Sequence, residues 1–349
     1  MSRRLLFSTQ QRFDRRTILK AIYQPFQGLT KDSAEYNALA HSGTVWENYF
    51  KPQNIEPYRA AQEKLQTTLA EVDKLKEMVF SKPGQQWNET NRALVDEYAQ
   101  QSTALELNPL RVGDSLLIGD KLRKDLFPTI SNLQSMTPDA LATLALPSPE
   151  ALLPGKDGSQ VAELRNHIVV SHYLTEVGLA HPGTAGVSLP QMKQLCRLML
   201  AGTASEEAYS RGWGKRVALG DFRSAPIRVR SNPMRIFPYP QEVEACMKRF
   251  LRWRDDCHAS SHLHPLIMAT HLFLYFTHIH PFADGNGRVG RAMMADYLVR
   301  QGYVPPIFVA LERADYLKMV SDAQDGNPSE LCEAVASTQE EMLSRFRTR

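Results

Sequence analysis

The segment from Leu266 to Ile279 most constrains the fold of this chain. Nearly all of its residues are apolar, so a helix formed here has no polar face for water and must be enclosed by the rest of the protein. Pro281 follows His280 and disfavours a helical conformation in the residue before it, which predicts that the helix ends there. The run is shorter than the roughly 18 to 20 apolar residues that read as a membrane span. We therefore expect a buried central helix and no membrane span.

Helical periodicity dominates the remainder of the chain. Apolar residues recur at three- and four-residue steps from Leu65 to Val79, which predicts an amphipathic helix. Further helices are predicted at about 90–107, 160–177, 188–200, 240–253, 288–301 and 329–344. The one strand signal lies at about 225–238, where Ile227 and Val229 alternate with arginines before a turn at Ser231-Asn232-Pro233. The expected class is mainly α, with one small β-hairpin.

Charge and cysteine usage limit the partners and the compartment. The 349 residues include 41 basic and 38 acidic side chains, a formal net charge of +3, so no bulk basic footprint for nucleic acid is present. The four cysteines form no CxxC pair, which favours reduced thiols and a cytoplasmic or nuclear location. The basic start before Asp14 is weakly similar to a mitochondrial presequence, and this is the minor alternative to a solvated basic start.

The segment from His280 to Arg291 carries the chemistry. It places two glycines between the buried helix and the start of another helix. Glycines let the backbone approach a ligand closely, and the unpaired N–H groups of a first helical turn then point at it. This pattern is typical of an anion site, most often one for phosphate.

The side chains of the segment agree with a phosphate ligand. Arg288 and Arg291 stand three residues apart and share one helix face, so each can bind separate phosphate oxygens. Asp284 is placed to hold Mg²⁺ beside a polyphosphate. His280 can take a proton from an attacking hydroxyl, and Asn286 adds an amide. The set indicates phosphoryl or nucleotidyl transfer.

Three simpler interpretations compete with this one. Asp-Gly and Asn-Gly are hairpin turn signals, although both flanks here have helical period. A calcium loop fails because it would need carboxylates at Phe282 and Met293 when Gly287 takes the invariant glycine position. Zinc is disfavoured because the spacings of the histidines match no standard site, and those within the apolar helix fit a buried structural role.

The stretch His280-Pro-Phe-Ala-Asp-Gly-Asn-Gly-Arg-Val-Gly-Arg291 matches the HPFx(D/E)GNGRxxR signature of Fic-domain proteins at every fixed position. Other parts that resemble a Fic core are Gly220 to Arg223, Pro238 to Met247, His264-Pro265, Gly302 to Pro306 and Tyr316 to Gly326. The resemblance implies a Fic-type helical bundle with a small β-hairpin flap, preceded by a helical segment.

That resemblance divides the chain into an N-terminal helical segment at 1–89 and a Fic-type catalytic domain at 90–349. Within the domain it places an inhibitory helix at about 90–108, the flap hairpin at about 225–238 and the signature loop at 280–291.

The resemblance also implies an activity, namely transfer of AMP from ATP to a Ser, Thr or Tyr hydroxyl of a target protein. His280 would be the general base, and Asp284 would bind Mg²⁺ between the α- and β-phosphates. Asn286 and the N–H groups of Gly285 and Gly287 would stabilise charge on the α-phosphate.

The remaining phosphates and the target are assigned by the same resemblance. Arg288 would hold the β-phosphate and Arg291 the γ-phosphate, and Gln324 would reach the adenine. The hairpin flap would align a segment of the target by strand addition. The resemblance also allows a homodimer.

Many Fic proteins carry an inhibitory (S/T)xxxE(G/N) motif, whose Glu pairs with the last arginine of the signature. Here Ser102 and Glu106 fit, whereas Leu107 stands where Gly or Asn is usual. A Glu106–Arg291 pair would take the arginine away from the γ-phosphate, so we expect self-inhibition. In eukaryotic relatives the same Glu also supports removal of AMP, and this carries over to Glu106. A second partial match at Thr44 to Asn48 has its Thr one residue too close to Glu47, so it ranks below the match at Ser102 and Glu106.

Two alternatives to adenylyl transfer stay open. A Fic-type transferase can use another donor for UMP, phosphate or phosphocholine, although the intact Gly287 favours a nucleotide because the kinase-like branch usually has Lys or Arg there. The second alternative is a non-catalytic nucleotide-binding module. The retained His280 disfavours it because a binding module needs no base.

Overall fold

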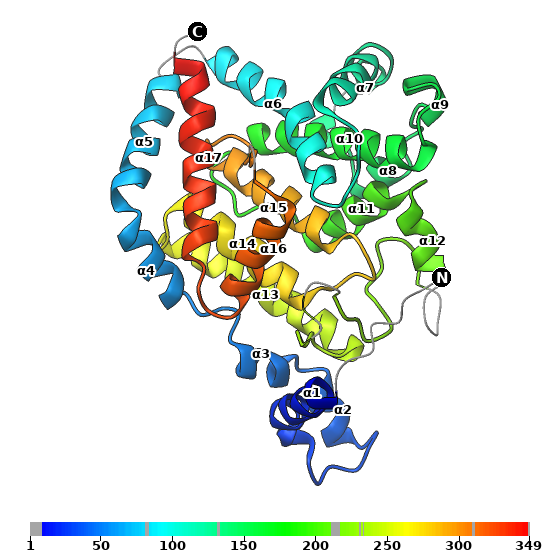
Figure 1. Cartoon of the computed structure of the whole chain (residues 1–349), viewed down its shortest axis with the longest axis vertical. Helices are drawn as coiled ribbons and strands as arrows, with labels where there is room; N and C mark the ends of the chain where they lie inside the picture. Colours follow the sequence, from blue (N-terminus) through cyan, green and yellow to red (C-terminus); the bar gives the residue numbers. More distant parts are fainter. Residues whose placement is uncertain are drawn as a thin grey trace.

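The computed structural model describes residues 9–80, 84–130, 133–210, 217–229, 232, 234–308 and 311–347, and its regular structure there is helical (Figure 1). The first helices are α1 (Thr9–Ile22), α2 (Ala34–Ala40), α3 (Thr44–Phe50), α4 (Glu56–Lys64), α5 (Gln66–Phe80), α6 (Gly84–Ala104), α7 (Val112–Asp125), α8 (Pro138–Ala142) and α9 (Pro149–Leu152). They are followed by α10 (Gly158–Ala180), α11 (Leu189–Leu200), α12 (Ala204–Ser210), α13 (Pro240–Ser260), α14 (Pro265–Ile279), α15 (Asn286–Arg300), α16 (Arg313–Gln324) and α17 (Ser329–Arg347). The mainly α class predicted from the sequence is confirmed.

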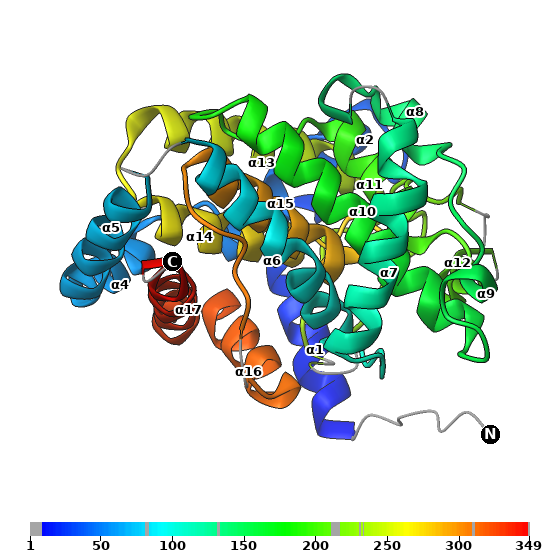
Figure 2. The same cartoon turned by 90° about the horizontal axis from the view of Figure 1, so that it is seen from above.

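Helix α14 is the centre of the fold, as its apolar sequence predicts. Every residue from Leu266 to Ile279 is buried. Helices α13, α15, α16 and α17 pack against it, and α10 and α6 lie beyond α15 (Figures 1 and 2). Among the described helices, none is long and apolar enough to cross a bilayer.

The ends of α14 follow from its flanking residues. Pro265 occupies the first turn, where a missing N–H costs nothing, and the His264 side chain accepts a hydrogen bond from the Leu266 N–H at 3.3 Å. At the other end His280 adopts a left-handed conformation, with φ 53° and ψ 61°, and its N–H bonds the Phe276 carbonyl at 3.0 Å. The chain thereby leaves the helix and enters the signature loop.

Residues 46–79 of the N-terminal segment contribute to the same core as the rest of the chain. One continuous cluster of buried apolar side chains runs from Trp46 to Leu343, and α5 packs along α17. Helix α1 lies at one end of the molecule (Figure 1), where Ile22 meets Val45 and Ile236 in a separate small cluster. The domain division proposed at residues 89 and 90 stays a prediction.

The β-hairpin predicted at about 225–238 is not formed by the described residues of that segment. Arg230, Ser231 and Pro233, at its expected turn, lie outside them. The described arms are held by a side chain, because the buried Arg223 guanidinium donates to the Ala225 carbonyl at 3.3 Å and the Pro238 carbonyl at 2.6 Å. Prolines, which have no N–H to donate, occur in both arms and weaken any ladder between them.

Candidate active site

The signature loop joins the end of α14 to the start of α15, and an asparagine inside it fixes its shape. The Asn286 Oδ1 accepts the Phe282 N–H, and its Nδ2 donates to the Phe282 carbonyl, both at 2.9 Å. This buried amide therefore braces the loop backbone. The α-phosphate contact that the resemblance assigned to Asn286 stays a prediction.

His280 has the protonation state that a general base requires. Its Nδ1 lies 2.9 Å from the Thr277 carbonyl. A carbonyl only accepts, so Nδ1 carries the proton and Nε2 keeps its lone pair. Burial lowers the pKa of His280 to about 4, so the ring is neutral at pH 7. The Phe237 ring, 4.6 Å away between centroids, covers the imidazole.

Arg288 is held at the first turn of α15. Its side chain is 4% exposed, and its Nη1 lies 2.5 Å from Oε1 of Glu163 on α10. Its Nη2 donates to Ser205 Oγ at 3.0 Å and lies 3.3 Å from Asp284 Oδ1. Neither Glu163 nor Ser205 was singled out from the sequence, and neither has a local signal because both contacts span more than 80 residues.

Arg291 lies one turn further along α15 and is bound by the end of α6. Its Nε donates to Ser102 Oγ at 2.9 Å, and its Nη2 donates to the Ser102 carbonyl at 2.8 Å and to Glu106 Oε1 at 2.7 Å. The Tyr316 hydroxyl lies 3.4 Å from Nη1. The structure thus brings together the three side chains that the inhibitory motif pairs, Ser102, Glu106 and Arg291.

Glu106 lies over the start of α15. A Cβ added to Gly287 would come within 2.7 Å of Glu106 Oε1, so a larger residue here would require this carboxylate to shift. Partial burial raises the pKa of Glu106, but the charges of Arg291 and Arg288 outweigh it and hold the pKa below its ordinary value. A carboxylate therefore lies beside the helix N-terminus, where the sequence predicts a bound anion.

Leu107, where the inhibitory motif usually has Gly or Asn, lies at the end of α6. Leu107 adopts a left-handed conformation, with φ 73°, and ends α6. The Leu107 N–H donates to the Ala104 carbonyl, and the Asn108 N–H donates to the Thr103 carbonyl. This is the Schellman pattern, in which Gly or Asn is usual because their left-handed conformation costs least.

Asp284 is the one carboxylate in the signature loop. Its Oδ1 accepts the Gly285 N–H at 2.6 Å, and its side chain is 45% exposed. No cluster of three or more His, Cys, Asp or Glu side chains that could hold a metal is found among the described residues. A cation here would need oxygen ligands from a bound molecule and from water.

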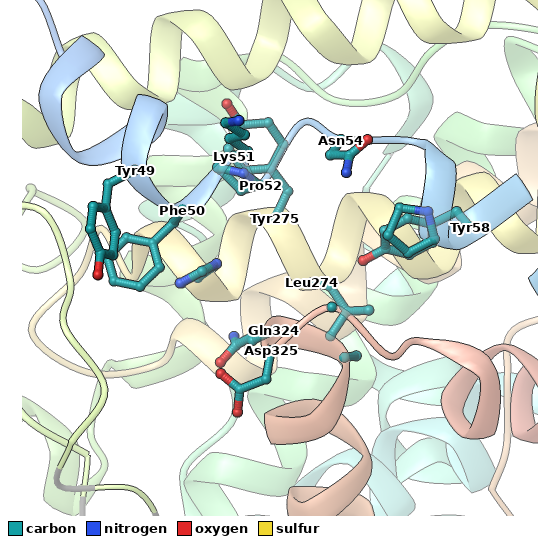
Figure 3. A pocket seen from close by; sticks show the side chains of 14 residues that line it. Tyr49, Phe50, Lys51, Pro52, Asn54, Tyr58, Leu274, Tyr275, Gln324 and Asp325 are labelled. Atoms are coloured by element: carbon teal, nitrogen blue, oxygen red, sulfur yellow. The ribbon is translucent and has the colours of Figure 1, made fainter. Parts of the chain in front are cut away.

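Gln324 is the last residue of α16 and lies beside the last turn of α14. Its Nε2 donates to Thr277 Oγ1 at 3.3 Å, one turn before His280. It lines a cavity of about 340 Å³ between residues 49–58 and the ends of α14 and α16 (Figure 3). Figure 3 shows Gln324 and Asp325 at this cavity with Tyr49, Phe50 and Tyr58. The adenine contact assigned to Gln324 stays a prediction.

Two residues that suggested other interpretations of the sequence, Glu47 and His271, lie in the core. Glu47, from the second partial inhibitory match, is buried and bonds Arg249 and the Tyr275 hydroxyl, so it belongs to the core. His271 is also a core residue, since it stacks on Tyr58 with ring centroids 3.7 Å apart and bonds the Pro52 carbonyl.

Comparison with known proteins agrees with this geometry. The Fic/DOC family matches residues 187–298. Proteins named protein adenylyltransferase Fic from Drosophila persimilis and Drosophila melanogaster are each 34% identical over 127 residues, or 36% of this chain. The chain covers 24% and 25% of those relatives, about a quarter of their length.

Solved Fic structures share the fold. Fic-1 from C. elegans (residues 134–508) matches with a TM-score of 0.58 at 17% identity, over 97% of this chain and 95% of that one. A Fic domain containing signalling protein from Bacteroides thetaiotaomicron matches with a TM-score of 0.54 at 19% identity, over 80% of this chain and 95% of that one. Residues 187–298, which the Fic/DOC family matches, contain the loop, its two arginines and the histidine. This part of the chain is therefore a Fic domain of the Fic/DOC family.

Proposed function

We propose that this protein is a protein adenylyltransferase, which transfers AMP from ATP to a Ser, Thr or Tyr hydroxyl of a target protein and is inhibited by its own Glu106. The observation that carries the proposal is a neutral His280, with its Nε2 lone pair retained, beside a helix N-terminus flanked by two arginines. The name of the similar Drosophila proteins supports adenylyl transfer over other phosphoryl chemistry.

The reaction assigned to this site is an in-line displacement. The target hydroxyl oxygen bonds the α-phosphorus and gives its proton to His280 Nε2. The bond from the α-phosphorus to the oxygen that bridges to the β-phosphorus breaks, and pyrophosphate leaves. The first N–H groups of α15 face the α-phosphate, while Arg288 and Arg291 hold the β- and γ-phosphates.

Mg²⁺ fits the carboxylate of this loop. Asp284 is half-exposed and single, which suits a cation that keeps most of its ligands as water and phosphate oxygens. When bound there, Mg²⁺ would neutralise charge that develops on the departing pyrophosphate. Asp284 also approaches Arg288, so the carboxylate can keep that arginine in line with the phosphates.

Inhibition follows from the partners of Arg291. Glu106 and Ser102 occupy three of the donor contacts of its guanidinium, which a γ-phosphate would otherwise use. A charge-assisted contact of this kind is worth about 1.5 to 3 kcal/mol. Removal of the carboxylate should therefore raise productive ATP binding roughly tenfold to a hundredfold.

The test is transfer of label from ATP labelled on the α-phosphate, with Mg²⁺, into the protein itself and into a cell lysate. We expect weak labelling by the wild type, labelling at least tenfold stronger by Glu106→Gly, and none by Glu106→Gly with His280→Ala. Label on the γ-phosphate, labelled UTP and labelled CDP-choline test the other donors. Binding of ATP by Glu106→Gly without any transfer would contradict the proposal and favour a binding module.

A further inference from the structure

The two arginines of the signature are held by carboxylates of different solvent exposure. Glu106, on the last turn before Leu107, is 31% exposed and bonds Arg291. Glu163 lies in the second turn of the long helix α10, is 15% exposed and bonds Arg288. Glu163 is therefore the more enclosed partner and Glu106 the more accessible one.

The orientation of Arg288 depends on this more enclosed partner. Its Nε is buried and has no hydrogen-bond partner within the described structure. The guanidinium is consequently aimed by its two terminal nitrogens, one bonded to Glu163 and the other to Ser205. Loss of the Glu163 charge would leave a buried guanidinium with its closest counter-charge removed.

The same carboxylate reaches the end of the inhibitory helix. Glu163 Oε2 accepts a hydrogen bond from Asn108 Nδ2 at 2.9 Å, and that nitrogen also lies 3.0 Å from the Gln160 carbonyl. Asn108 closes α6 through its N–H on the Thr103 carbonyl, two residues after Glu106. One carboxylate thus contacts both the nucleotide arginine and the segment that carries the inhibitor.

We propose that Glu163 is a positioning residue shared by the nucleotide site and the inhibitory helix. It aims Arg288 at the β-phosphate, and through Asn108 it anchors the end of α6 so that Glu106 lies on Arg291. The role toward phosphate rests on the proposed function, whereas the anchoring of α6 does not. Each half has its own measurement.

The first measurement is nucleotide binding by calorimetry in the Glu106→Gly background. We expect added Glu163→Gln to weaken binding of ATP and ADP at least tenfold and to leave AMP, which has no β-phosphate, unchanged. Glu176→Gln is the matched control, because Glu176 lies on the same helix and pairs with Arg92 away from the loop. Melting temperatures establish that each variant is folded.

Two outcomes of that measurement would overturn the role toward phosphate. Tighter ATP binding by Glu163→Gln would make Glu163 a competitor of phosphate. An equal loss for AMP, ADP and ATP would make its effect merely structural.

The second measurement is hydrogen exchange without nucleotide, which tests the anchor even if the proposed reaction is wrong. Asn108→Asp keeps an acceptor for the Leu110 N–H but replaces the donor to Glu163 by a second carboxylate. We expect this variant and Glu163→Gln to exchange the Leu107 and Asn108 amides at least tenfold faster. Exchange equal to that of the wild type would overturn the anchoring role.

Discussion

Leu107 shows how a single residue can weaken the end of a helix. It occupies the left-handed position that ends α6, and it is 72% exposed, so no packing compensates for the conformation. A left-handed residue other than glycine costs about 1 to 2 kcal/mol. The Schellman hydrogen bonds of this helix end are formed nevertheless. Glu106 is therefore presented to Arg291 by a helix end that is less stable than it could be.

We expect Leu107→Gly to stabilise the protein by about 1 kcal/mol and to lower adenylyl transfer of the wild type, because the inhibitory helix is held more firmly. Urea unfolding and label transfer measure the two effects. Leu117→Gly is the matched control: Leu117 is also exposed but lies within α7, so the same change should destabilise by about 1 kcal/mol. Destabilisation by both changes would contradict the role given to Leu107.

The contacts of the two arginines differ in how far the sequence could predict them. Glu106 lies 185 residues before Arg291, yet a motif of fixed spacing marks it. Glu163 lies 125 residues before Arg288 and belongs to no such motif. Its charge is one among many on predicted helix surfaces, and only the packing of α10 on α15 brings it to the loop.

Among the elements, the described part of the segment between α12 and α13 is joined to the end of α14 by the Arg223 guanidinium. Arg223 is buried, and its Nε donates to the His280 carbonyl at 2.8 Å while its terminal nitrogens bond Ala225 and Pro238. Its backbone N–H bonds the Pro281 carbonyl, next to the bridge between Phe222 and Phe282. Burial lowers the pKa of Arg223 to about 10, which still leaves it charged at pH 7. The Arg223 side chain thus joins the expected flap to His280, the proposed general base.

We expect Arg223→Ala to lower the free energy of unfolding by about 3 kcal/mol, because three carbonyls lose a charged donor. In the Glu106→Gly background it should also lower transfer more than tenfold, since the His280 carbonyl loses its charged donor. Urea unfolding and label transfer test this. Arg252→Ala, on the exposed face of α13, should change stability by no more than about 0.5 kcal/mol. Full transfer by a folded Arg223→Ala would contradict this role of Arg223.

The long helices predicted from the sequence are present, whereas the described residues of 225–238 do not form the hairpin predicted there. Helix α15 was expected at about 288–301 and runs from Asn286 to Arg300, because its apolar residues recur at the helical period. The alternation of Ile227 and Val229 has the period of a strand, but a strand also needs backbone partners. In this segment a side chain, Arg223, supplies the partners instead.

At the scale of the whole molecule, packing joins what the sequence divides. The proline-rich stretch before α10 and the break after α5 read as connections, yet buried side chains from Trp46 to Leu343 form one cluster. Helix α5 belongs to the N-terminal segment and packs on α17, at the other end of the chain. Contacts between such distant segments leave no local periodicity, so the sequence could not reveal them.

Buried histidines give this core a dependence on pH. Burial lowers the pKa of His271 and of His278 to about 3 and that of His280 to about 4, whereas an unfolded histidine titrates near 6.5. Between pH 6.5 and about 4 the unfolded chain therefore binds more protons than the folded one. Stability is present above pH 6.5 and is lost as the pH falls. Each such histidine contributes about 1.4 kcal/mol per pH unit in this window.

We accordingly expect the free energy of unfolding in urea to fall steeply between pH 6.5 and pH 5. His271→Gln removes one titrating group while its amide can still donate to the Pro52 carbonyl. The slope of stability against pH should then decrease by about 1.4 kcal/mol per unit. Comparison of the two proteins at pH 7 separates the cost of the substitution itself from its effect on the slope. An unchanged slope in His271→Gln would show that the protonation of this buried ring does not drive the loss of stability, and the other buried histidines, such as His278, would have to account for it.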